Sequence, residues 1–317
     1  MTTYDIIADI HGQHALLERL LERLGYGGIA GSRRHPDGRK VVFLGDFVDR
    51  GPAVRETLRL ARTMVEAGDA LAIMGNHEYN AIAFHTPDGS GGFVRPHTPA
   101  NVGQHSATLA AFEGRPGEWA DYLEWFESLP LFLDLGGVRV VHACWDDAAI
   151  ADLGGSPRFR RSMLRPPGTP RTPEQHASDR LLKGPEIPLP GGKGYPGSEG
   201  QLRTDARVKW WLTPADWRCR DLVLQVPEGV LDGEELPIKH RSRIMGYAAD
   251  APPLIFGHYG FPKPAQPLIP NAACIDQGVH RGGGLAAYRW SGETVLDPSN
   301  FVIEGATPAK VPPHDEY

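Results

Sequence analysis

The sequence is poor in cysteine and has no long hydrophobic run, and each absence narrows what the protein can be. Its 317 residues include 3 cysteines, an odd number without the spacing of a zinc site, so we expect neither a disulfide framework nor a cysteine-ligated metal. No stretch approaches the ~18 consecutive apolar residues of a membrane-spanning helix. The first residues have no basic start and no apolar signal core. We therefore expect a cytoplasmic protein without a membrane partner.

Several catalytic motifs are also missing. No Gly-Lys-Ser/Thr segment occurs, which excludes a P-loop kinase, and residues 25–28 (Gly-Tyr-Gly-Gly) follow a helical pattern rather than a strand, which excludes a dinucleotide fingerprint. A cysteine phosphatase needs arginine as the sixth residue after cysteine. Here Cys144 is followed at that spacing by Ile150, and Cys274 by His280. The net charge of -6 argues against a protein that coats nucleic acid with its whole surface.

Positive charge gathers in the middle of the chain. Residues 156–220 contain 13 Lys or Arg and 6 Asp or Glu, a net charge of +7. Because the whole chain has a net charge of -6, the remaining residues carry a net charge of -13. Prolines and glycines interrupt the same stretch, which predicts extended loops rather than long helices or strands. Two interpretations remain open: a solvated, partly flexible insertion, or a basic lid that attracts a polyanionic substrate.

The hydrophobic pattern elsewhere predicts an α/β fold. Short apolar runs at residues 4–8, 40–44 and 70–74 are typical of buried strands, and helical patterns follow at residues 16–24 and from Pro52. This alternation favours parallel strands. Further along we expect a helix at 119–129, a hairpin from 131–135 and 138–141, and strands at 253–256, 272–275 and 285–290. The tail after Asn300 is expected to wrap loosely over the surface.

Each predicted strand ends at a polar cluster with a glycine beside it. The clusters are Asp-Ile-His-Gly at 9–12, Gly-Asp-Phe-Val-Asp-Arg-Gly at 45–51, Gly-Asn-His-Glu at 75–78, His142, and Gly-His at 257–258. Ligands of open α/β sheets bind beyond the carboxyl ends of the strands, so these groups can converge. One such cluster alone means little, and Asn is a common helix cap. Five in succession indicate one site.

The residue types in these clusters indicate a metal centre. Carboxylates, imidazoles and an amide oxygen suit Mn²⁺, Fe²⁺ or Zn²⁺, and no thiolate is present. The six candidate ligands are Asp9, His11, Asp46, Asn76, His142 and His258. Six donors exceed the needs of one tetrahedral ion but suit two ions that share a carboxylate. Two ions roughly 3.5–4 Å apart promote in-line attack at phosphorus.

The order of these clusters resembles the calcineurin-like metallophosphoesterase superfamily, and residues 45–51 resemble its phosphoprotein phosphatase branch. That branch includes bacterial diadenosine-tetraphosphatases and the phosphatase domain of bacterial polynucleotide kinase-phosphatases. Residues 274–278 and 282–285 resemble its last strand pair. The resemblance implies a four-layer α/β/β/α sandwich. We expect residues 1–145 and 245–300 to form this core, 146–244 a basic Pro/Gly-rich insertion or lid, and 301–317 a C-terminal tail.

The resemblance also implies a role for each matching residue. Asp9 and His11 would hold the first metal, Asp46 would bridge both, and Asn76, His142 and His258 would complete the second. Mn²⁺ is the preferred expectation for both ions, with Fe, Zn or Ni as alternatives. His77 would be the general acid, oriented by Asp49, and Arg50 would bind the phosphoryl oxygens. A water activated by the metals would attack phosphorus as hydroxide.

The sequence departs from the superfamily at two points. At 257–260 it reads Gly-His-Tyr-Gly, without the second histidine that nucleases of the superfamily carry, which argues against a nuclease. The second phosphate-binding residue is not identifiable. Its candidates are Arg180, Lys183, Arg207 and Lys209, all in the expected insertion. The Trp210-Trp211 pair could stack on a base, although adjacent tryptophans more often pack in a core or lid.

We therefore expect a two-metal phosphoesterase that acts on nucleotide-type esters or anhydrides, such as a dinucleoside polyphosphate or a nucleic-acid end phosphate. A serine/threonine protein phosphatase is the alternative within this class, and an inactive metal-binding scaffold is the alternative outside it. The oligomeric state stays open.

Overall fold

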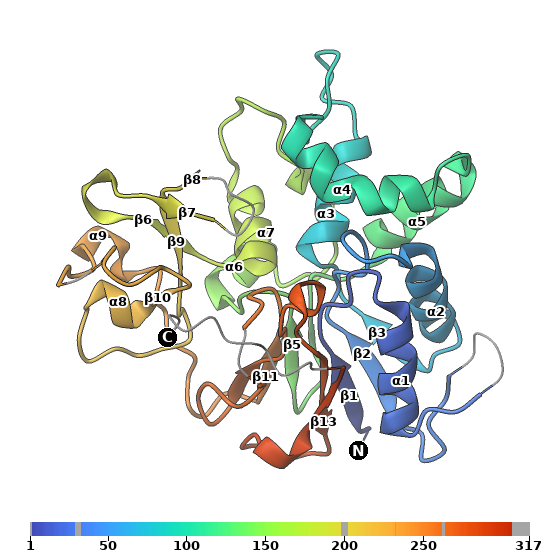
Figure 1. Cartoon of the computed structure of the whole chain (residues 1–317). Coiled ribbons are helices and arrows are strands. Elements are labelled where there is room, and N and C mark those ends of the chain that lie inside the picture. Colours follow the sequence, from blue (N-terminus) through green and yellow to red (C-terminus); the bar gives the residue numbers. More distant parts are fainter. Residues whose placement is uncertain (1, 29–32, 198–201, 232, 262–263, 306–317) are drawn as a thin grey trace. The chain divides into compact units, whose positions relative to one another are not determined.

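The computed structural model describes residues 2–28, 33–197, 202–231, 233–261 and 264–305. Within it the chain forms two compact units (Figure 1). The first unit extends to Lys183 and resumes at Pro252, and the second comprises Gly184–Ala251. The first unit thus includes 146–183, a segment that we expected in the insertion. No helix of the described residues is long and apolar enough to cross a membrane.

The larger sheet of the first unit has the strand order β14-β13-β1-β2-β3. Its strands are β1 (Tyr4–Ile7), β2 (Lys40–Phe43), β3 (Ala70–Ala72), β13 (Leu285–Trp290) and β14 (Phe301–Glu304). β1, β2 and β3 are parallel, as the alternating pattern predicts, while β13 is antiparallel to β1 and β14 to β13. β1 is buried along its whole length, which is typical of a strand covered on both faces.

Two amphipathic helices pack against this sheet. α1 (His14–Leu24) buries Leu17, Leu20, Leu21 and Leu24 and contacts β13 and β14. α2 (Val54–Glu66) contacts β3 and α1. α2 begins two residues later than Pro52, because Ala53 is its N-cap and the proline precedes the helix.

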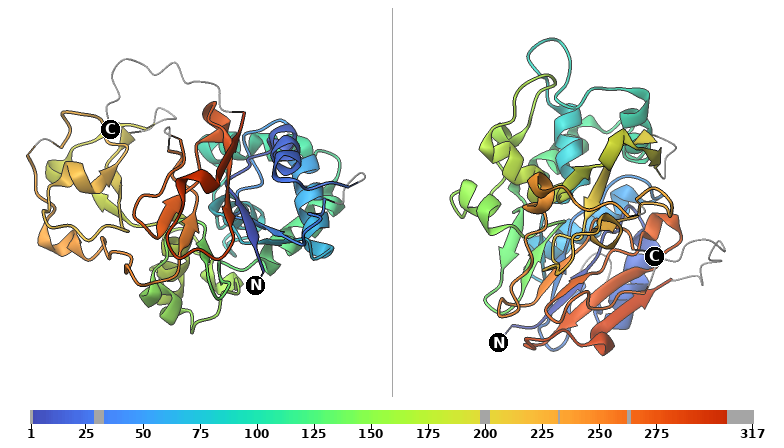
Figure 2. Two further views of the ribbon diagram at one scale, coloured as in Figure 1. Left: turned by 90° about the horizontal axis from the view of Figure 1, so that it is seen from below. Right: turned by 90° about the vertical axis from the view of Figure 1, so that its left-hand side faces the viewer.

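The second sheet of this unit has the order β12-β11-β5-β4 and lies beside the first sheet (Figure 2). Its strands are β4 (Phe132–Asp134), β5 (Arg139–Val141), β11 (Leu254–Phe256) and β12 (Ala272–Cys274). β4 and β5 form the predicted antiparallel hairpin, and β11 runs parallel to both β5 and β12. The carboxyl ends of β5 and β11 therefore lie side by side.

The remaining helices of the first unit connect and cover the sheets. They are α3 (Asn76–His85), α4 (Pro99–Ala111), α5 (Pro116–Ser128), α6 (Asp147–Asp152) and α7 (Pro173–Lys183). Single 3₁₀ turns occur at Arg161–Met163, Val279–Arg281 and Pro298–Asn300. α5 confirms the helix expected at 119–129. α3 packs on α5, α4 on α2, and α6 on α7.

The basic central stretch contains more regular structure than its prolines and glycines predict. α7 buries Leu181 and Leu182 in the first unit. The second unit has its own sheet, ordered β10-β9-β6, and a two-stranded ribbon, β7-β8. Its elements are β6 (Glu186–Pro188), a 3₁₀ turn (Pro190–Gly192), β7 (Tyr195–Pro196), β8 (Leu202–Arg203), β9 (Asp205–Val208), α8 (Cys219–Leu222), β10 (Val223–Leu224) and α9 (Ile238–Arg241). These strands have two to four residues, too few to show a sequence period.

Trp210 and Trp211 are 0% and 3% exposed, so they pack in the second unit's core, the more common of the two interpretations given above, and offer no open face to a base. One further expectation differs from the structure. The first part of the expected loose tail, Phe301–Glu304, forms β14 instead, because its backbone pairs antiparallel with β13. The last part of the tail, from residue 306 on, lies outside the described residues.

Candidate metal centre and active site

The six predicted metal ligands lie at the carboxyl ends of five strands in the first unit. Asp9 and His11 follow β1, Asp46 follows β2, Asn76 follows β3, His142 follows β5 and His258 follows β11. One hydrogen bond ties the two sheets together here, since His142 Nδ1 donates to the carbonyl oxygen of Leu44, 2.8 Å away. The strand ends of both sheets therefore meet at one place, as the sequence predicts.

The backbone at this place is strained. Six described residues other than glycine have a positive φ, and five of them are predicted site residues. They are His11 (47°), Asp46 (51°), Asp49 (69°), Arg50 (68°) and His258 (74°). Such conformations cost free energy and concentrate at functional sites. The fold thus accepts strain to aim these side chains at one point.

Two glycines allow the carboxylates to approach the backbone closely. A Cβ atom on Gly75 would lie 2.2 Å from Asp46 Oδ1, and one on Gly257 would lie 2.1 Å from Asp9 Oδ1. Any other residue at either position would displace the carboxylate. These contacts explain the glycine in both the Gly-Asn-His-Glu and the Gly-His motif.

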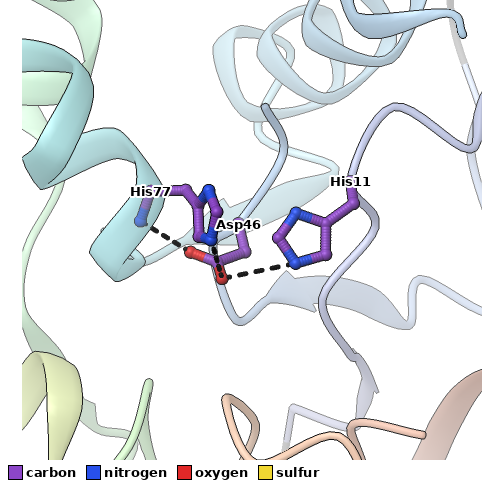
Figure 3. Close-up of side chains that lie close together, drawn as sticks. All are labelled: His11, Asp46 and His77. Atoms are coloured by element: carbon purple, nitrogen blue, oxygen red, sulfur yellow. Dashed lines mark hydrogen bonds and ion pairs between the residues drawn. The ribbon is translucent and has the colours of Figure 1, made fainter. Parts of the chain in front are cut away.

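Asp46 lies at the centre of the site. In Figure 3 its carboxylate lies between His11 and His77, with His11 Nε2 3.6 Å and His77 Nε2 3.9 Å from Asp46 Oδ2. These three side chains form one group able to hold a metal ion, and Asp9, Asp46 and His142 form a second. Within each group the candidate ligand atoms lie within 4.8 Å of one another. Because Asp46 belongs to both groups, its position suits a bridging carboxylate.

Asn76 brings the last two predicted ligands into contact. Its Oδ1 lies 2.9 Å from His142 Nε2 and 2.7 Å from His258 Nδ1. The backbone amide of His258 also donates to Asp9 Oδ2, 3.0 Å away. All six predicted ligands therefore gather in one cluster. The first of the two groups contains His77, which the sequence predicts as a general acid rather than as a ligand.

The donor set fits divalent cations. His11 Nδ1 donates to the carbonyl oxygen of Val48 at 3.0 Å, and His142 Nδ1 donates to that of Leu44. The Nε2 lone pair of each imidazole therefore remains available to a metal. The His142 Nε2 lone pair faces Asn76 Oδ1, and two electron-pair donors at 2.9 Å repel each other unless a cation or a proton lies with them. Asp9 Oδ1 is buried without a hydrogen-bond partner among the described residues. A cation would satisfy each of these atoms.

The electrostatics of the cluster agree with this interpretation. Burial, with the carboxylates of Asp276 and Asp46 nearby, raises the pKa of Asp9 well above its ordinary value. Burial, with His77 beside it, lowers the pKa of His11 to about 4, which keeps this imidazole neutral. Burial alone would raise the pKa of Asp46, but the surrounding imidazoles of His142, His77 and His11 lower this pKa to about 2. Positive charge at the centre would relieve the repulsion between the two aspartates.

Asp49 and His77 form a buried pair beside the cluster. His77 Nδ1 lies 2.6 Å from Asp49 Oδ2, which leaves Nε2 directed toward Asp46. Burial alone would lower the pKa of His77, but the carboxylates of Asp46 and Asp49 raise it above its ordinary value. The pair thus favours a protonated His77, the form that a general acid needs. Arg50 is exposed next to this pair in the chain.

Glu78 supports the site and is not among the residues predicted from the sequence. Its fully buried carboxylate accepts four backbone N–H groups, from Asp46 (2.7 Å), Phe47 (2.8 Å), Val48 (3.3 Å) and Gly75 (3.0 Å). Burial and the charge of Asp46 raise the pKa of Glu78 to about 7. Glu78 therefore holds the strained loop after β2 in place. Its position at the end of the Gly-Asn-His-Glu motif is a signal that could have identified it.

His105 and Thr108 of α4 are the other residues that were missed. Both are buried and both bind the carboxylate of Asp49. Asp276, after β12, accepts the backbone amides of Gly260 (2.6 Å) and Gly278 (2.8 Å) and so fixes the loop that follows His258. Asp276 lies at a strand end, where a sequence pattern can point to it, whereas His105 and Thr108 lie on a helix, where no strand-end pattern can.

The basic residues proposed for phosphate binding have protein partners. Lys183 Nζ lies 2.8 Å from Asp179, and Arg180 Nε lies 3.1 Å from Asp146. In the second unit Arg207 Nε lies 3.8 Å from Glu186, and Lys209 Nζ donates to the carbonyl oxygen of Asp221 at 3.0 Å. Their role in substrate binding stays a prediction.

Comparison with known proteins agrees with these motifs. The family model described as calcineurin-like phosphoesterase matches residues 2–190. The bis(5'-nucleosyl)-tetraphosphatase PrpE [asymmetrical] of Geobacillus sp. (strain WCH70) is 44% identical over 145 residues, which are 44% of this chain and 56% of that protein. The protein of the same name from Halalkalibacterium halodurans is 46% identical over 74 residues, 23% of this chain and 30% of the relative.

The chain thus spans about half or less of the length of these relatives. A solved structure described as a putative diadenosine tetraphosphatase covers 96% of this chain and 94% of its own, at 17% identity and a TM-score of 0.47. The family model matches more than half of the 317 residues and includes the first four of the five strand-end clusters. The chain therefore belongs to the calcineurin-like phosphoesterase family.

Proposed function

We propose that the protein is a two-metal phosphoesterase that hydrolyses nucleotide-type phosphate esters or anhydrides, with a dinucleoside polyphosphate or a nucleic-acid end phosphate as substrate. The observation that carries the proposal is the position of Asp46, whose carboxylate belongs to two groups of candidate metal ligands and lies 3.9 Å from Nε2 of His77. The two relatives described above support the nucleotide class, since each bears the name bis(5'-nucleosyl)-tetraphosphatase.

The metal-binding residues of the proposal are the six that gather at the strand ends. Asp9 and His11 would hold one ion, Asn76, His142 and His258 would hold the other, and Asp46 would be shared. Asp9 also lies with Asp46 and His142 in the second group of candidate ligands. Mn²⁺ is the proposed metal, because hard oxygen and borderline nitrogen donors are mixed and thiolates are absent from the cluster. When bound, a pair of divalent cations neutralises charge on the phosphoryl group and lowers the pKa of the attacking water.

The chain's own residues supply the proton for the leaving group. The water oxygen bonds to phosphorus and loses its proton to solvent, and the bond from phosphorus to the leaving oxygen breaks, so that this oxygen keeps the electron pair. His77 then donates its Nε2 proton to that oxygen. Asp49, 2.6 Å from His77 Nδ1, orients the imidazole and stabilises its cationic form. Arg50 binds the phosphoryl oxygens with its guanidinium group.

A substrate panel tests the proposal. The full chain, loaded with Mn²⁺, is given diadenosine tetraphosphate, an oligonucleotide with a 3′-phosphate, a phosphoserine peptide, and nitrophenyl esters of phosphate as monoester and diester. We expect turnover of one of the first two substrates with a higher kcat/KM than that of the peptide. Faster hydrolysis of the peptide would replace the nucleotide class by the protein phosphatase alternative. Metal binding without hydrolysis of any ester would favour the inactive scaffold.

A further inference from the structure

α4 buries polar residues where a surface helix normally buries apolar ones. Of its thirteen residues, from Pro99 to Ala111, the two that are buried are His105 and Thr108. They are 0% and 1% exposed, and their spacing of three places them on one face of the helix. Burying polar side chains costs free energy unless they are hydrogen-bonded. The face that α4 presents to the core is therefore built to make specific hydrogen bonds.

Both side chains bind the same carboxylate. His105 Nδ1 lies 2.7 Å from Asp49 Oδ1, and the Thr108 hydroxyl donates to that same oxygen at 2.6 Å. The Thr108 hydroxyl also accepts the backbone amide of Asp49 at 2.9 Å. Asp49 has a positive φ of 69°, so Thr108 fixes a strained backbone and the side chain that it carries.

These bonds leave one oxygen of Asp49 for His77. Oδ1 is occupied by His105 and Thr108, whereas Oδ2 faces His77 Nδ1 at 2.6 Å. Asp49 is held at two places, its backbone amide and its Oδ1 atom, so its carboxylate cannot rotate. The direction of Oδ2, and with it the plane of the His77 ring, is therefore set by α4. His105 Nε2 is buried without a hydrogen-bond partner among the described residues, a cost that the Nδ1 bond to Asp49 offsets.

We propose that His105 and Thr108 are positioning residues that act through Asp49 to aim His77 at the leaving-group oxygen. The inference rests on the proposed function of His77 as the general acid. It predicts that loss of either residue weakens proton donation rather than metal or substrate binding. The loss of kcat in such a variant must then be larger for a basic leaving group, which needs a proton to depart, than for one that departs as an anion.

Matched substitutions separate positioning from packing. Thr108→Val keeps the shape and removes the hydroxyl, while Thr108→Ser keeps the hydroxyl. His105→Phe keeps a ring and removes the donor, while His105→Asn places an amide donor near the position of Nδ1. Thr57→Val is the control, because Thr57 is equally buried and its hydroxyl donates to the Ala53 carbonyl in α2, away from Asp49.

The kinetic readout compares a nitrophenyl ester with a phenyl ester of whichever phosphate class, mono- or diester, the wild type hydrolyses. The nitrophenolate departs without a proton, and the more basic phenolate needs one. Thr108→Val and His105→Phe should lower kcat on the phenyl ester by about 10-fold or more, as loss of outer hydrogen-bond partners does, with KM unchanged. The nitrophenyl ester should be nearly unaffected. Thr108→Ser, His105→Asn and Thr57→Val should behave as wild type.

Two further measurements make the inference separable from the proposed function. In a His77→Ala background, Thr108→Val should cause no additional loss, because it acts through the missing imidazole. In the metal-free protein with ¹⁵N-labelled histidine, Thr108→Val should shift the His77 Nδ1 resonance, whereas Thr57→Val should not. Equal losses on both esters, or an unmoved His77 resonance, would overturn the positioning role. If His77→Ala lowers kcat equally on the nitrophenyl and the phenyl ester, His77 is not the general acid and that part of the proposed function is wrong. The His77 resonance alone then decides whether α4 orients His77.

Discussion

At the scale of single residues, the site depends on how a few buried polar atoms are shared. The carboxylate of Asp46 faces His11, His77 and His142, and its Oδ1 also accepts the backbone amide of His77 at 2.9 Å. Asp49 divides its two oxygens between His77 and α4 in the same manner. Because each oxygen has a defined partner, replacing one residue is expected to remove one function and leave the others.

His77→Ala tests this separation. We expect the two-ion content to be unchanged, because the six proposed ligands remain, and turnover to fall by ~10²-fold or more, as loss of a general acid does. Elemental analysis and kcat on the preferred substrate measure the two quantities. His176→Ala, at an exposed position of α7, is the matched control and should change neither. Equal rates in variant and parent would remove the acid role from His77.

The six candidate ligands could be located from the sequence because each lies shortly after a strand. Asp46 and His142 are far apart in the chain and follow strands of different sheets, but an apolar run before each marks it as a residue beyond the carboxyl end of a strand. His105 and Thr108 have no such signal. They reach Asp49 across 56 and 59 positions of sequence from one face of a helix, and only the packing of α4 brings them there. Partners of this kind cannot be located from a local pattern.

At the scale of elements, α3, α4 and α5 form a helical layer in which histidines meet aromatic rings. His85, the last residue of α3, accepts the indole N–H of Trp119 of α5 at 2.9 Å. Its ring also lies 5.6 Å from that of His105 of α4. This layer supports the α4 face that binds Asp49, so its stability bears on the site.

The protonation of His85 predicts how this layer responds to pH. Burial, with His105 and His97 nearby, lowers the pKa of His85 from 6.5 to about 4. Between these values the unfolded chain binds more protons than the folded one, so stability rises with pH across this window. The contribution is intact above pH 6.5 and is lost as the pH falls toward 4.

His85→Gln isolates this contribution, because the amide oxygen can accept the Trp119 N–H and does not titrate. Between pH 7 and pH 5 the urea midpoint of the wild type should fall more than that of the variant. Parallel curves for the two proteins would show that His85 does not carry the effect.

The helices and strands could be predicted from the sequence where apolar residues form clear runs or a clear helical pattern. They could not be predicted where the strands are very short or where prolines and glycines surround the element. β1, β2, β3 and α1 lie where periodicity places them. α7 was missed although Leu181 and Leu182 are its core contacts, because the prolines and glycines around it dominate the composition of 156–220. The two-residue strands β7, β8 and β10 are defined by pairing between segments, which no local pattern encodes.

At the scale of the whole molecule, the candidate metal centre lies in one unit. All six proposed ligands, together with His77 and Asp49, belong to the first unit, whereas Arg207 and Lys209 belong to the second. Composition revealed the positive balance of 156–220, but it could not show that this segment is divided between two units at Lys183. A boundary of that kind depends on which residues pack together.

Metal binding should therefore stabilise the first unit as a whole, because buried carboxylates such as Asp9 and Asp46 repel each other without a cation. At a free Mn²⁺ concentration of about 100 times Kd, linkage adds about 2.7 kcal/mol to the free energy of unfolding for each ion that binds. For a unit of this size each ion then raises Tm by roughly 5–10 °C. Thermal unfolding with Mn²⁺ or with a chelator measures the difference.

Asp46→Asn decides whether both ions depend on one bridge. With one charge and one bridging oxygen removed, we expect the loss of at least one ion by elemental analysis and a smaller Mn²⁺-dependent rise in Tm. Asp134→Asn, an exposed aspartate at the end of β4 whose carboxylate pairs with Arg139 at 3.0 Å, is the control and should keep both ions and the full rise. Asp46 is the residue that the two ligand groups share. If the Asp46→Asn variant still bound two ions, the two groups would hold their metals independently, and the bridging role would have to be abandoned.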